Sequence, residues 1–134
     1  MKLSIALAAS LLMVVPANAQ TDTSSAAVYL PSCLAAADIA QGKHPAADST
    51  EAAKQLRKAA LCFGAITAVA GLEPLFKPEF AACPPADKKI TFNQMVLTVT
   101  GYLKSHREKL GENFHQLAAA ALVNAWPCAK PSSK

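Results

Sequence analysis

Four cysteines constrain the fold of this chain more than any other feature of its sequence. They are Cys33, Cys62, Cys83 and Cys128, in a chain of 134 residues. An even number of cysteines in a short exported chain favours disulfides. A zinc site would usually take cysteine pairs about two to four residues apart, and these cysteines are spaced far more widely. We therefore expect two disulfides, and no metal or other cofactor.

The amino-terminal segment predicts that the chain is exported. Residues 1–19 combine one lysine, an apolar run up to Val15 and small residues before Gln20, which is the pattern of a cleavable secretory signal. A membrane anchor would need about 20 apolar residues, and this run is shorter. We expect residues 20–134 to form a single periplasmic domain, with an ordered core at about residues 25–128.

The periodicity of apolar residues predicts an all-α protein. The chain is 52% hydrophobic and rich in alanine, which suits close-packed helices. Pro31 is expected in the first turn of its helix, where the missing N–H is harmless, and Gly42 is expected to end that helix. The predicted helices lie within Ser25–Gln41, from about Thr50 to Gly71, from Thr91 to Ser105 or His106, and from Gly111 or Glu112 to Trp126.

The second predicted helix has a wide apolar face, which suggests more than one neighbour. Gly64 lies in its middle and costs about 1 kcal/mol relative to alanine, so we expect another helix to approach closely there. Its predicted buried stripe is Leu56, Ala59, Ala60, Phe63, Ile66 and Ala70, with Cys62 and Val69 extending it sideways.

The helix arrangement favours one disulfide pairing among the three that four cysteines allow. Cys33 and Cys62 fall in the two arms of a first helical hairpin, and Cys83 and Cys128 flank the same end of a second. We therefore favour the pairs Cys33–Cys62 and Cys83–Cys128. The resulting prediction is a small four-helix bundle stapled by two disulfides.

The sequence carries no recognisable reactive constellation. It has no G-x-S-x-G nucleophile motif, and its only Glu-x-x-His pair, Glu112 with His115, occurs once, whereas di-metal bundles need two copies. The formal charge of +4 comes from scattered basic residues, which is far from a nucleic-acid-binding footprint. We expect a protein that is not an enzyme and does not bind nucleic acid.

Two polar or aromatic segments are candidates for binding a protein partner. The most charged is the turn at residues 104–109, and the other is the loop Phe76–Phe80, with two aromatics near prolines. An ordinary polar turn and aromatic side chains packed on the core are the simpler interpretations of the two segments. The alternative is an interface, where aromatic side chains are common anchors. The candidate residues are Phe76, Lys77, Phe80, Lys104, His106, Arg107 and Lys109.

The motif Tyr102-Leu103-x-x-His106, followed by Trp126-Pro127-Cys128, resembles the Rap/Tai-type immunity proteins. Cys33 and Cys62-x-Gly64 match the amino-terminal half of that family, and the resemblance spans about residues 25–128. It implies a small periplasmic helical protein, in some cases a homodimer, that blocks the active-site cleft of a cell-wall amidase effector delivered by type VI secretion. Arg107 stands where the family usually has proline, and the loop between Cys33 and Cys62 is longer.

A second hypothesis is a periplasmic stress chaperone or an envelope structural protein of unknown partner. Such helical chaperones expose apolar surface when acid triggers them. Only three histidines and nine acidic residues are present as triggers, and two disulfides would resist opening. Assays of client aggregation at low pH would distinguish this hypothesis from an immunity role.

Overall fold

The computed structural model describes residues 22–43, 49–72, 81–84 and 89–128. This part of the chain is built from helices, which confirms the all-α prediction. The elements are α1 (Ala26–Ala40), α2 (Ser49–Leu72), α3 (Phe92–Ser105), the short 3₁₀-helix η3 (Arg107–Lys109) and α4 (Phe114–Ala125). The predicted signal segment 1–19 lies outside the described residues.

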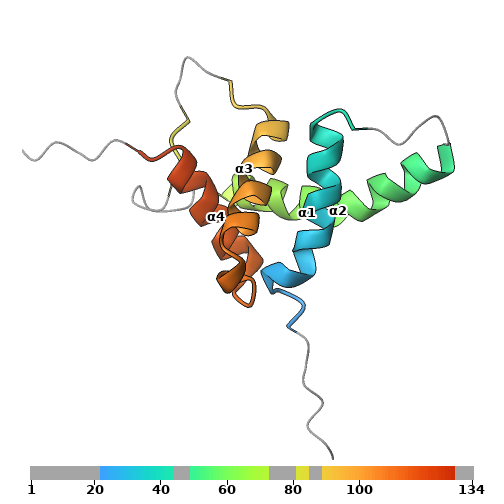
Figure 1. Cartoon of the computed structure of the whole chain (residues 1–134). Helices are drawn as coiled ribbons and strands as arrows, with labels where there is room; N and C mark the ends of the chain where they lie inside the picture. Colours follow the sequence, from blue (N-terminus) through green and yellow to red (C-terminus); the bar gives the residue numbers. More distant parts are fainter. Residues whose placement is uncertain (1–21, 44–48, 73–80, 85–88, 129–134) are drawn as a thin grey trace, which may run out of the picture.

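Three of the helices stand side by side, and the fourth crosses them (Figure 1). α3 and α4 form the expected antiparallel hairpin, and α1 runs antiparallel to α3. α2 crosses behind these three helices, and it crosses α1 steeply instead of running alongside it as a hairpin arm. The longest helix therefore connects the other three across one face of the molecule.

Both predicted disulfides are confirmed. Cys33 on α1 is bonded to Cys62 on α2, with the two Cα atoms 5.0 Å apart, and Cys83 is bonded to Cys128 with 4.7 Å between Cα atoms. Ala36 and Ala59 are completely buried near the first bridge in sequence. Small side chains of this kind let the backbones of α1 and α2 approach within disulfide distance.

All four helices contribute buried side chains to the core, with small ones from α1 and larger ones from α3 and α4. The largest fully buried side chains are Phe114, Ile66, Leu103, Val96, Val99, Cys33 and Cys62. The predicted stripe of α2 is wrong in part, because Leu56 is 56% exposed and Ala60 is also exposed. Its predicted sideways extension, Cys62 and Val69, is buried as expected. The disulfide holds the Cys62 side of α2 against α1, so the buried face is rotated toward that side.

The end of α1 follows the sequence, but its start does not. Gly42, with φ of 72°, ends the helix as predicted. Its N–H donates to the Ile39 carbonyl, and the N–H of Lys43 donates to the Asp38 carbonyl, which is the Schellman arrangement. α1 begins at Ala26, so Pro31 lies beyond the first turn, contrary to expectation.

Two further expectations about helix positions are wrong. α4 starts at Phe114 and not at Gly111 or Glu112, because the Asn113 side chain caps it by accepting from the N–H groups of two following residues. At Gly64, an added Cβ would meet no atom within 4 Å. Among the described residues, no helix approaches that glycine closely, and the glycine is exposed.

Candidate partner-binding surface

Four of the predicted partner-binding residues lie together on the turn that joins α3 to α4. Lys104 is in the last turn of α3 and Arg107 is in η3, and both are exposed. His106 and Lys109 are half-buried. The structure thus brings the basic part of the prediction onto one short segment, where Lys104 and Arg107 are open to solvent.

His106 is held in place by the end of α3. Its ring stacks on the ring of Tyr102 with 4.0 Å between centroids, and its Nδ1 lies 2.9 Å from the Tyr102 carbonyl oxygen. The backbone N–H of His106 donates to the same carbonyl. Tyr102 and His106 therefore hold each other in place through these contacts. The pair marks the end of α3.

The turn is also bound to the start of α1. The N–H of Ala26 donates to the Glu112 carbonyl and that of Ala27 to the Leu110 carbonyl, each at 2.8 Å. The first N–H groups of a helix have no partner within the helix, so these two carbonyls satisfy them. A bond of 2.8 Å from the N–H of Phe114 to the Ser24 carbonyl adds a third link. The turn is consequently ordered before any partner binds.

The chain that enters α1 is ordered by a local acidic turn. The Asp22 carboxylate accepts from the Ser24 hydroxyl at 2.7 Å and from the Ser24 N–H at 2.9 Å. These bonds stabilise the charged carboxylate and so lower the pKa of Asp22. The bond from the Ser24 hydroxyl has the larger effect, and the bond from the Ser24 N–H has the smaller one. The next residue, Ser25, forms an isolated antiparallel bridge with Asn113, which places this acidic turn beside the α3–α4 turn.

The other predicted segment cannot be placed beside this turn. Phe76, Lys77 and Phe80 lie outside the described residues. The described chain resumes at Ala81, next to Ala82, which forms an isolated bridge with Pro127 after α4. The involvement of the Phe76–Phe80 loop in binding remains a prediction.

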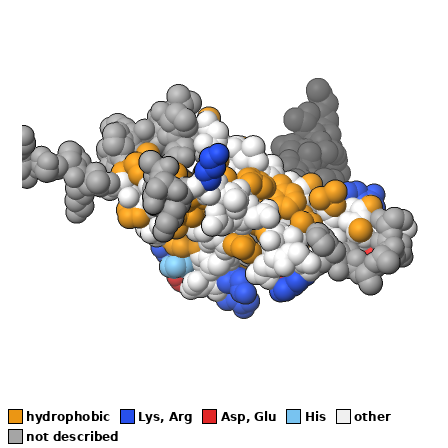
Figure 2. Space-filling model, turned by 90° about the horizontal axis from the view of Figure 1, so that it is seen from above, with side chains coloured by type: hydrophobic (Ala, Val, Ile, Leu, Met, Phe, Trp, Pro, Cys, Tyr) orange, Lys and Arg blue, Asp and Glu red, His pale blue; other side chains and the backbone are white. Residues whose placement is uncertain are grey.

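Sequence reasoning missed an apolar groove between α2 and α4. Its volume is about 670 Å³, and it has polar side chains among the apolar ones. The lining residues are Val69, Leu72, His115, Gln116, Ala119, Ala120, Val123 and Asn124. The groove joins two helices that are far apart in sequence, so no local pattern could have revealed it. Figure 2 shows the wider surface, with a band of hydrophobic side chains across one face and Lys and Arg side chains near its edges.

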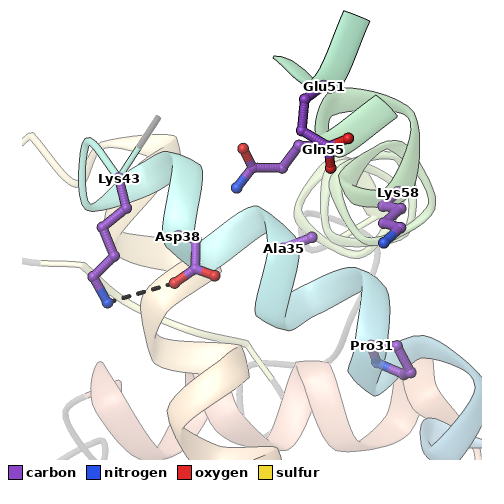
Figure 3. Close-up of a pocket in the computed structure, with 7 residues that line it drawn as sticks. All are labelled: Pro31, Ala35, Asp38, Lys43, Glu51, Gln55 and Lys58. Carbon is purple, nitrogen blue, oxygen red and sulfur yellow. Dashed lines mark hydrogen bonds and ion pairs between the residues drawn. The ribbon is translucent and has the colours of Figure 1, made fainter. Parts of the chain in front are cut away.

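A second, polar groove lies where α2 crosses α1 (Figure 3). Asp38 and Lys43, from the end of α1, form an exposed ion pair at 3.5 Å, drawn as a dashed line. Glu51 and Gln55 reach toward the groove from α2. Exposed pairs of this kind contribute little to stability, so this groove is an open, mixed-charge surface.

Within residues 22–43, 49–72, 81–84 and 89–128, no three His, Cys, Asp or Glu side chains gather to hold a metal ion. None of the helices described is long and apolar enough to cross a membrane.

The fold and this surface define a class of protein: a small helical domain, cross-linked by two disulfides, that presents an ordered turn and shallow grooves. Comparison with known families identifies the class further. The chain belongs to the Rap1a immunity protein family, whose sequence model matches residues 24–128. No curated protein and no solved structure matches the chain. The matched region contains all four helices and all four cysteines.

Proposed function

We propose that this chain is an exported immunity protein that binds a cell-wall amidase effector and blocks its active-site cleft. The observation that carries this proposal is the family match over residues 24–128, which covers the entire helical domain. The signal-like segment at residues 1–19 supports a periplasmic location. The protein itself performs no catalysis in this proposal, since covering a cleft requires only a stable complex.

The α3–α4 turn is the contact that we propose. It is held by Tyr102 on one side and by the start of α1 on the other, so little conformational entropy is lost when a partner binds it. The exposed cations Lys104 and Arg107 would favour a partner with an acidic rim. Electrostatic complementarity of this kind mainly raises the association rate and improves specificity.

Charge reversal on this turn tests the proposed contact. Arg107→Glu should weaken binding to the cognate effector by about tenfold, mainly through a slower association rate. Arg57→Glu is the matched control, because Arg57 is also an exposed arginine but lies on α2. Surface plasmon resonance at two salt concentrations measures both variants. Equal losses for the two variants, or none for Arg107→Glu, would exclude the turn as the contact.

The stoichiometry of the complex tests the homodimer that the family resemblance implies. A homodimer would give a complex of two immunity chains with two effector chains, whereas a monomer would give one of each. Light scattering after size-exclusion chromatography distinguishes the two masses. A free chain that stays monomeric at the highest concentration, and binds one effector, would reject the dimer.

A further inference from the structure

The two disulfides of this protein lie in opposite environments. Cys33 and Cys62 are both completely buried, and their bridge joins two packed helices. Thr100 of α3 donates a hydrogen bond of 3.1 Å to the Cys33 carbonyl, so a third helix closes over the same place. Cys83 is exposed and Cys128 is half-buried, and both lie outside the helices.

The outer disulfide holds together two short segments for which the described part of the chain shows few other links. Beside it, the N–H of Cys83 donates to the Trp126 carbonyl at 2.7 Å, and Ala82 pairs with Pro127. The Cys128 sulfur lies 3.2 Å from the Ala81 carbonyl oxygen. We call residues 81–84 and 126–128 the clasp. The largest fully buried side chains all come from the helices and none from the clasp.

Thiol–disulfide exchange requires a thiolate to reach one of the two sulfur atoms. An exposed cysteine permits this attack in the folded protein. A bridge with no exposed surface is attacked only after the helices around it separate, and the open fraction of a stable domain is about one in a thousand or lower. The same reductant therefore meets two bridges of very different accessibility.

We propose that the Cys83–Cys128 bridge is a redox-responsive clasp, which a dithiol reductant opens while the Cys33–Cys62 bridge and the helical core stay intact. One thiolate of the dithiol attacks the Cys83 sulfur and displaces the Cys128 thiolate, giving a mixed disulfide. The second thiol of the reductant, as thiolate, then attacks that mixed disulfide and releases Cys83. In total two electrons and two protons pass to the protein, and the reductant leaves as a disulfide. This inference does not depend on the proposed immunity function.

The protein contains its own reporter of the clasp. Trp126 is the only tryptophan in the chain, it packs against the core, and its carbonyl accepts the Cys83 N–H. Opening the clasp should expose this side chain to water. Its fluorescence emission should then shift to longer wavelength while far-UV circular dichroism stays unchanged.

The test uses the chain purified without residues 1–19 and treated with dithiothreitol. Samples are quenched with N-ethylmaleimide and mapped by mass spectrometry after proteolysis. We expect Cys83 and Cys128 to be labelled first, together with the fluorescence shift, and Cys33 and Cys62 to be labelled at least about a thousandfold more slowly. Labelling of all four cysteines in one phase, or of the inner pair first, would overturn the proposal.

Two controls separate accessibility from intrinsic reactivity. In guanidinium chloride, where the chain is unfolded, both bridges should be reduced at rates within about tenfold of each other, because protection by folding is lost. The double variant Cys83→Ser/Cys128→Ser should show no rapid phase of labelling. Persistence of a large rate difference in denaturant, or a rapid phase in the double variant, would contradict the assignment to the clasp.

Discussion

Replacing Gly64 with alanine should stabilise this protein, because Gly64 lies in the middle of α2. Among the described residues, no atom lies within 4 Å of a Cβ built at this position, so the substitution introduces no clash with them. Alanine is favoured over glycine in a helix interior by about 0.5–1 kcal/mol, because its unfolded backbone has less freedom to lose. For a domain of this size the thermal midpoint should rise by about 2–4 °C.

Gly42 provides the matched control for this prediction. A Cβ there would also meet no atom within 4 Å, but the backbone has φ of 72°, which disfavours alanine by about 1–2 kcal/mol. The same substitution should therefore lower the free energy of unfolding at Gly42 and raise it at Gly64. Urea unfolding followed by circular dichroism measures both, with unchanged m-values. Destabilisation by Gly64→Ala would refute the reasoning and show that this face of α2 is covered.

Substitutions at three further positions test the packing and the cap of α4. Asn113→Ala removes the cap of α4 and should cost about 1 kcal/mol in urea unfolding, whereas Asn113→Asp should cost little. Phe114→Ala removes a fully buried ring that stacks on the ring of Tyr29, with 4.2 Å between centroids. We expect the free energy of unfolding to fall by about 3–5 kcal/mol, and a fall below about 1 kcal/mol would contradict the placement of this ring in the core. Thr100→Val removes the side-chain hydrogen bond to the Cys33 carbonyl, which lies within α1 and keeps its helical hydrogen bond. Calorimetry should therefore show a loss of about 0.5–1.5 kcal/mol in the free energy of unfolding.

The carboxy-terminal half of the fold could be predicted well from the sequence. α3 and α4 carry large apolar side chains at helical spacing, and Val96, Leu103 and Leu117 are among the buried residues. α1 and α2 are rich in alanine, which differs little in hydrophobicity between the inner and outer faces. The stripe predicted for α2 was therefore wrong in part, because Leu56 is 56% exposed.

The candidate site shows a similar division between local and long-range information. The charged turn after α3 was located from composition alone. Its order could not be predicted, because the Glu112 and Leu110 carbonyls accept from the N–H groups of Ala26 and Ala27, respectively, which are far away in sequence. Backbone–backbone bonds leave no signature in side-chain identity. The groove between α2 and α4 was missed because it too depends on long-range packing, namely on where α2 crosses the α3–α4 hairpin.

The most direct test of the central claim is a titration of effector activity. The chain without residues 1–19 would be added in increasing amounts to the cognate amidase effector that the proposal requires, and the release of cleaved peptidoglycan peptides would be followed. We predict that cleavage falls to zero near equal molar amounts, since a tight complex covers the cleft. Undiminished cleavage in the presence of excess folded, oxidised protein would contradict the proposal that this chain inhibits such an enzyme.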